Sequence, residues 1–142
     1  MKRILAVILS LVVMFTCCCG SAFAATSSNS RASLTLSSYG VTLHPSLSLR
    51  KIDVNYDVRA TSLASSVGVE RIEIYKANGT FVTSTTGTTA NGLVRANYVM
   101  HKGTFTYTLT SGTSYYAVVT IFARVGSNYD SRTITTATVM AP

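Results

Sequence analysis

Residues 51–60 read Lys-Ile-Asp-Val-Asn-Tyr-Asp-Val-Arg-Ala, and apolar side chains alternate with charged or polar ones throughout the stretch. Successive side chains of a β-strand point to opposite faces, so a period of two predicts a strand with one face in the core and one in solvent. The predicted core face consists of Ile52, Val54, Tyr56, Val58 and Ala60.

The same alternation recurs along the chain between turn residues, which predicts an all-β fold. Asn78-Gly79 favours a tight hairpin turn, and Asn91-Gly92 and Ser111-Gly112 indicate two further turns. Residues 61–68 and 83–92 are small and polar, and we expect both to be connections. The other predicted strands cover residues 33–37, 41–43 (ended by His44-Pro45), 69–76 with a return strand from Phe81, 93–100, 104–110, 115–125 (the most apolar, expected to be buried on both faces) and 132–140.

The first 24 residues predict a secretory signal peptide. Lys2 and Arg3 precede the apolar run Ile4–Cys19, and Ala22-Phe23-Ala24 matches the small-x-small cleavage pattern. Lipid anchoring at a cysteine and an uncleaved anchor are the alternatives. Cleavage after Ala24 removes all three cysteines and leaves ten basic and five acidic residues, a net charge of +5. We therefore expect a secreted, extracellular protein, or one associated with the cell envelope.

The predicted mature chain divides into a disordered leader, residues 25–31, and a single domain, residues 32–142. The leader is small and polar, a composition that does not bury enough apolar surface to fold. The remaining length suits one domain with a single core.

Around the turn at residues 109–115, Leu-Thr-Ser-Gly-Thr-Ser-Tyr, the chain resembles fibronectin type III domains. Ala117, Val119, Ile121 and Ala123 continue the pattern as an alternating strand. The resemblance implies an immunoglobulin-like or fibronectin-III-like sandwich of seven to nine antiparallel strands, with Tyr115 as a corner tyrosine bonded to nearby backbone. The chain has no Trp, and Tyr56 takes the place of the usual core Trp.

The chain is also similar to a group of small exported proteins of Gram-positive bacteria that has no assigned activity. That similarity implies export and fold, and transfers no functional residue. The matching stretches are Val58-Arg-Ala-Thr61, Val67-Gly-Val-Glu-Arg-Ile-Glu-Ile74, Tyr115-Tyr-Ala-Val-Val-Thr120 and Ser131-Arg-Thr-Ile-Thr-Thr136.

Residues able to carry catalysis or bind a metal are sparse, so we expect neither an enzyme nor a cofactor or metal site. The two histidines, His44 and His101, are interpreted as exposed loop residues, and there is no Gly-x-Ser-x-Gly motif. Asp53-x-Asn55-x-Asp57 lies on a predicted strand, which spreads its oxygens too far apart for a calcium site. We interpret it as a solvated strand face between Lys51 and Arg59.

One outward face is the candidate binding surface. If Tyr115, Ile72 and Ile74 face the core, the alternate side chains of the two strands, including Val69, Glu73 and Thr120, face outward. Immunoglobulin-like topology makes these strands neighbours, and aromatic residues with arginine are typical of interfaces. Burial under residues 83–92 or under the leader is the alternative. The predicted patch consists of Tyr75, Tyr116, Val118, Phe122, Arg71 and Arg124.

These features predict an exported, non-catalytic binding or surface-interaction module. The alternatives are a secreted inhibitor or effector that uses its loop tips against a protein target, and a small hydrolase. The partner is unknown; a cell-envelope polyanion, a protein and weak self-association all stay open. The basic residues are scattered and form no stripe of the kind that binds nucleic acid specifically.

Overall fold

The computed structural model describes residues 34–142, so the predicted signal peptide and leader lie outside the described residues. This part of the chain contains nine β-strands and no helix. The strands are β1 (Leu36–Pro45), β2 (Lys51–Ala64), β3 (Ser66–Lys76), β4 (Phe81–Thr86), β5 (Val94–Arg95), β6 (Tyr98–Thr108), β7 (Ser114–Val125), β8 (Asn128–Thr135) and β9 (Val139–Met140).

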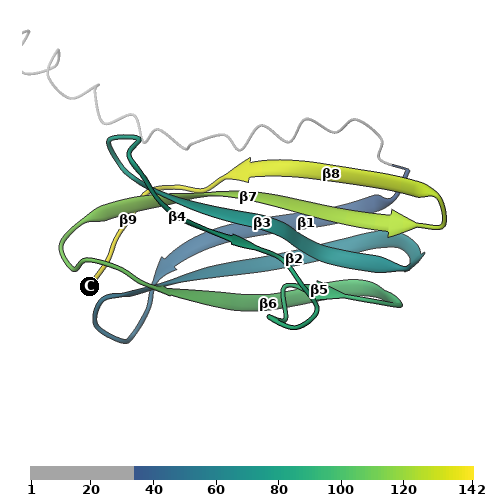
Figure 1. Ribbon diagram of the computed structural model, residues 1–142, viewed down its shortest axis with the longest axis horizontal. Helices are drawn as coiled ribbons and strands as arrows, with labels where there is room; N and C mark the ends of the chain where they lie inside the picture. Colours follow the sequence, from purple (N-terminus) through teal and green to yellow (C-terminus); the bar gives the residue numbers. More distant parts are fainter. Residues whose placement is uncertain (1–33) are drawn as a thin grey trace, which may run out of the picture. The chain divides into compact units, whose positions relative to one another are not determined.

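The strands form two antiparallel sheets, and the predicted all-β sandwich is confirmed. One sheet has the order β1-β2-β6 and the other the order β4-β3-β7-β8, with β5 paired to β3 and β9 paired to β7. Figure 1 shows the sheets as two layers, with β3, β7 and β8 above β2 and β6. Neighbours such as β2 and β6 are far apart in sequence, so each sheet depends on long-range pairing.

The core lies between β2 and β7, whose alternation is as predicted. On β2 the apolar side chains from Ile52 to Ala60 are buried, whereas Asp57 and Arg59 are exposed. On β7 every second residue from Tyr115 to Ala123 is buried. This burial of a continuous apolar layer from both sheets is the main stabilising contribution to such a fold.

Tyr115 occupies the predicted corner position. Its side chain is buried, and its hydroxyl accepts a hydrogen bond from the Thr110 backbone N–H at 3.2 Å and donates one to the Thr110 carbonyl at 3.4 Å. These bonds connect the start of β7 to the turn that precedes it. The largest fully buried side chain therefore also satisfies its polar group, as a buried tyrosine requires.

The hairpin predicted at Asn78-Gly79 joins β3 to β4. Gly79 has a φ of 86°, a value that suits glycine, and the Asn78 side chain accepts a hydrogen bond from the Thr80 N–H at 3.0 Å. The turn matters for the site described below because it sets Phe81 opposite Tyr75.

The predicted connection at residues 61–68 was wrong, and the one at residues 83–92 was wrong for its first four residues, because small polar residues can be strand residues where a neighbouring strand supplies the hydrogen bonds. In residues 61–68, β2 continues to Ala64, which pairs with Tyr98, and β3 begins at Ser66. In residues 83–92, the first four belong to the edge strand β4. Only residues 87–92 form a connection.

Three local predictions of side-chain direction were also wrong. Val69 is fully buried, because a bulge between Val69 and Arg71 shifts the register of β3 against β7. Thr35 is buried and Leu34 exposed, and the Thr35 hydroxyl donates to the Ala123 carbonyl at 3.2 Å. β7 is fully buried on one face and half-buried on the other, since nothing in the described residues packs a second layer onto its outer face.

Several predicted strand ends also differ. β1 runs through His44 and Pro45, which is compatible with its place at a sheet edge. The predicted strand 93–100 is divided between the short β5 and the start of β6. The predicted strand 132–140 is likewise divided between β8 and β9, which pair with different parts of β7.

Candidate functional site

The outer face of the β4-β3-β7-β8 sheet carries the predicted patch. Alternation along β7 points Tyr116, Val118 and Phe122 away from the core, and each is half-buried. In the register of β3 against β7, Tyr75 lies opposite Tyr116, and Glu73 lies opposite Val118. The strand pairing that builds the core therefore also gathers these side chains on one surface.

The first aromatic cluster lies at the hairpin end of this face. The rings of Tyr75 and Tyr116 are stacked, with centroids 5.4 Å apart and planes 11° apart. Phe81 meets Tyr75 edge to face at 5.6 Å and is 52% exposed. Sequence reasoning missed Phe81, because a two-residue Asn78-Gly79 turn would pair Phe81 with Lys76, whereas the observed register sets it opposite Tyr75.

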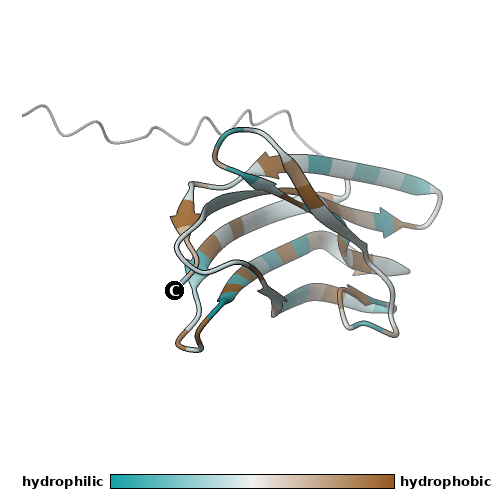
Figure 2. Ribbon diagram, turned by 60° about the vertical axis from the view of Figure 1, so that its left-hand side comes forward, coloured by the Kyte–Doolittle hydropathy of each residue, from teal (hydrophilic) through white to brown (hydrophobic). Residues whose placement is uncertain are grey.

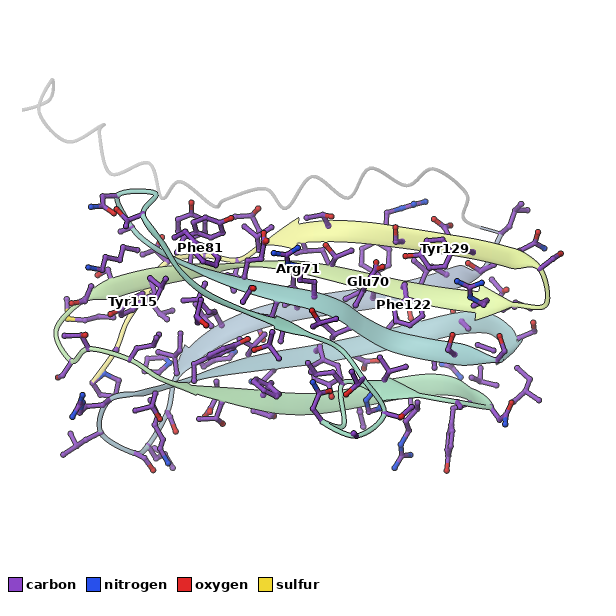
Figure 3. The ribbon with its side chains drawn as sticks, in the orientation of Figure 1. Glu70, Arg71, Phe81, Tyr115, Phe122 and Tyr129 are labelled. Atoms are coloured by element: carbon purple, nitrogen blue, oxygen red, sulfur yellow. The ribbon has the colours of Figure 1, made fainter. Side chains whose placement is uncertain are left out.

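The second aromatic cluster lies toward the other end of the face, as Figure 3 shows for Phe122 and Tyr129. Their ring centroids are 5.9 Å apart, and the Arg124 guanidinium lies 5.2 Å from the Tyr129 centroid. Tyr129 is 44% exposed and was also missed. Tyr129 belongs to β8, which starts four residues before the predicted 132–140 strand, and it pairs with Arg124.

Charged groups between the two clusters are paired with local partners. Arg71 forms an ion pair with Glu73 at 2.9 Å, and Glu73 accepts a hydrogen bond from the Tyr75 hydroxyl at 3.2 Å. The bulge in β3 exposes Glu70, which accepts a hydrogen bond from the Tyr129 hydroxyl at 2.7 Å. Two arginines and two glutamates thus balance one another on this face.

The tyrosine hydroxyls remain protonated at neutral pH. Burial and the neighbouring Glu73 carboxylate raise the pKa of Tyr75 above its ordinary value. Burial and the hydrogen bond to Glu70 raise the pKa of Tyr129. Both rings therefore present an apolar body and a neutral polar tip, the combination that makes tyrosine common at protein interfaces.

The six predicted residues thus form two groups and not one continuous patch. Tyr75 and Tyr116 lie toward the hairpin, Phe122 and Arg124 lie with Tyr129, and Val118 and Arg71 lie between the two groups. Residues 83–86 pair with β3 in the same sheet, so they extend the face and do not cover it.

His101 is not an exposed loop residue. It is buried on β6, where its Nε2 lies 2.7 Å from the Gly92 carbonyl oxygen and 3.2 Å from the Tyr56 hydroxyl. The Tyr56 hydroxyl also donates to that carbonyl at 3.0 Å. His101 and Tyr56 thus bind the Gly92 carbonyl in the connection before β5, which is a structural role. His44 is exposed, but it lies in β1.

The Asp53-x-Asn55-x-Asp57 face is a polar strand surface. Asp53 accepts a hydrogen bond from Thr106, and Asn55 accepts one from Thr104, each at 2.6 Å across the sheet. A shallow groove of about 420 Å³ lies here, where Gly40 has no side chain to fill it. Within residues 34–142 no three His, Cys, Asp or Glu side chains come together in a way that could hold a metal ion.

Comparison of the chain with known protein families gives no matching family model, and no curated protein or solved structure matches it significantly. The class that the fold defines is an all-β sandwich of two antiparallel sheets. Over the described residues, no helix is long and apolar enough to cross a membrane.

Proposed function

We propose that this protein is exported and acts as a non-catalytic binding or surface-interaction module, using the outer face of the β4-β3-β7-β8 sheet. The observation that carries the proposal is the pair of aromatic clusters on that face, with Phe81 and Tyr129 about half exposed. Exposed apolar groups with a polar rim are characteristic of interaction sites, and Tyr and Arg dominate their energetics.

The charge balance of the face favours a protein partner over a polyanion. Arg71 is paired with Glu73, and Arg124 lies over the Tyr129 ring. A polyanion would have to compete with the carboxylates of Glu70 and Glu73 for these cations. A protein surface can bury the aromatic rings while leaving the ion pairs at the rim, where they cost little desolvation.

The proposal that the protein is exported, and its resemblance to a known family, are based on the sequence. The positive start, apolar run and Ala22-Phe23-Ala24 site support a cleaved signal peptide. The resemblance to fibronectin type III domains is supported by the Tyr115 corner and by the division into a three-stranded sheet and a sheet built around β3 and β7. Non-catalytic binding is a common role for sandwiches of this kind, although fold alone does not determine function.

The double substitution Tyr116→Ser and Phe122→Ser tests this proposal. Purified protein is incubated with envelopes of the cells that produce it, and the bound fraction is measured. We expect the apparent affinity to fall at least about tenfold, because central aromatic residues carry most of the energy of an interface. Both side chains are only half-buried, so thermal unfolding should remain cooperative.

Tyr98→Ser is the matched control, since Tyr98 is an exposed tyrosine on β6 in the other sheet. It should leave the bound fraction unchanged. Equal binding by wild type and the double variant would contradict the proposed face. Loss of the cooperative transition in the double variant would show that the two side chains belong to the core.

A further inference from the structure

The loop between β1 and β2 displays two leucines to solvent. Leu47 is fully exposed, and Leu49 is 81% exposed. The two flank Ser48 in a connection that is otherwise short and polar. Figure 2 shows this loop as a hydrophobic projection at the lower edge of the molecule. Transfer of leucine side chains out of water lowers the free energy, so the exposure of two of them in one loop indicates a contact with an apolar surface.

The backbone of the loop is held by hydrogen bonds to the body of the sandwich. The Ser46 N–H donates to the Lys51 carbonyl at 3.0 Å, and the Leu109 N–H donates to the Arg50 carbonyl at 2.7 Å. Arg50 itself donates to the Pro142 carbonyl at 2.8 Å and has a φ of 63°, a conformation unusual for a residue other than glycine. The leucines are therefore presented from a constrained backbone.

The leucines lie at an end of the sandwich that carries basic residues. Arg50 and Lys51 follow Leu49 directly. The turn before β7 adjoins this loop through Leu109, and the β3–β4 hairpin adjoins that turn through a bond from the Ala77 N–H to the Ser114 carbonyl at 2.8 Å. Lys76 thus belongs to the same end of the sandwich. Residues 44–52, 76–81 and 108–115 contain no Asp or Glu.

We propose that loop 46–50 docks onto an anionic lipid bilayer, with Leu47 and Leu49 inserted at the interface and Arg50 and Lys51 against lipid phosphates. Exposed apolar side chains next to cations match the layering of a lipid surface, in which the phosphates border the acyl chains. The charge at this end is complementary to an anionic surface. This site is separate from the aromatic face, and its function does not depend on the proposed function above.

The proposal is tested by co-sedimentation of the protein with vesicles. One set contains phosphatidylcholine alone, and the other contains phosphatidylcholine and phosphatidylglycerol at about 3:1. We expect binding to the anionic vesicles that weakens with added salt. Leu47→Ser with Leu49→Ser should lower the partition coefficient at least about tenfold. Arg50→Gln with Lys51→Gln should lower it about fivefold for each cation removed.

Leu63→Ser is the matched control, because Leu63 is 63% exposed near the far end of β2. It should bind vesicles as the wild type does, and so should Tyr116→Ser with Phe122→Ser. Absence of binding to anionic vesicles would overturn the proposal. Equal losses in the Leu63 and Leu47/Leu49 variants would also overturn it, as would a loss caused by the cation substitutions alone. Binding that appears only when an envelope protein is added to the vesicles would likewise overturn the proposal, because the loop would then bind a protein.

A fluorescence measurement gives a second readout in which position 47 keeps a large apolar side chain. The chain contains no Trp, so Leu47→Trp introduces a single reporter. Its emission should shift to the blue when anionic vesicles are added, because the indole leaves water for the membrane interface. Leu63→Trp should show no shift. An unshifted Leu47→Trp spectrum in the presence of bound vesicles would contradict insertion.

Discussion

Tyr115→Ala is expected to lower the free energy of unfolding by about 3–5 kcal/mol, the range for removing a large buried aromatic side chain. Tyr115 is the largest fully buried side chain, and its hydroxyl satisfies both polar groups of the Thr110 backbone. The substitution therefore leaves a cavity and removes two hydrogen bonds to the Thr110 backbone. Urea unfolding followed by circular dichroism measures the change.

Tyr116→Ala is the matched control, since Tyr116 is the next residue on β7 and points to the outer face. It should cost roughly 1 kcal/mol, mostly the lost stacking on Tyr75. Tyr115→Phe should cost about 1 kcal/mol, the usual net value of a hydrogen bond. Similar losses from Tyr115→Ala and Tyr116→Ala would refute the assigned faces of β7.

Gly68→Ala is expected to destabilise the protein by about 2–5 kcal/mol, the combined range for backbone strain and overpacking. Gly68 has a φ of 148°, and a Cβ there would lie 2.2 Å from the Leu93 carbonyl oxygen. That oxygen belongs to backbone and accepts a hydrogen bond from the Val69 N–H at 2.8 Å, so it has little freedom to move. The thermal unfolding midpoint measures the effect.

Gly40→Ala is the control for this substitution. Gly40 lies in β1 at the sheet edge, and a Cβ there would have no atom within 4 Å. We expect this change to be neutral or to stabilise by up to about 1 kcal/mol, because alanine restricts the unfolded chain. If both variants unfold at the same temperature, the close approach of β3 to the residue 93 backbone is not as described.

The parts of the fold that were predicted from sequence are those whose evidence is local. The alternation of residues 51–60 and of residues 115–123 appears in the sequence itself, because one face of each strand is buried. The bulge at Glu70 is not a local property. It depends on how β3 aligns with β7, and it reverses the direction of Val69.

Polar residues gave the least reliable predictions for a related reason. The buried position of Thr35 depends on the Ala123 carbonyl, and that of His101 depends on Gly92 and Tyr56. Ala123 and Tyr56 are remote in sequence from the side chains they bind, and Gly92 lies in the connection before β5. Hydrophobicity alone places such side chains in solvent, and only the folded backbone supplies the acceptors that allow them to be buried.

The outward direction of Tyr75, Tyr116 and Phe122 could be predicted, because side chains alternate between the two faces of β3 and β7. Phe81 and Tyr129 were missed because they reach the face from β4 and β8, whose pairing with β3 and β7 had to be known. The ion pair between Arg71 and Glu73 was also not predicted from the sequence, and in the function that we propose it favours a protein over a polyanion among the partners left open.

Hydroxyl-radical footprinting of the protein bound to envelopes of the producing cells tests the central claim most directly. Phe81 and Tyr129 are exposed at the two ends of the candidate face, and Tyr98 is equally exposed on the other sheet. If the outer face of the β4-β3-β7-β8 sheet binds the partner, oxidation of Phe81 and Tyr129 falls on binding while that of Tyr98 is unchanged. Protection of Tyr98 with continued oxidation of Phe81 and Tyr129 would contradict the account.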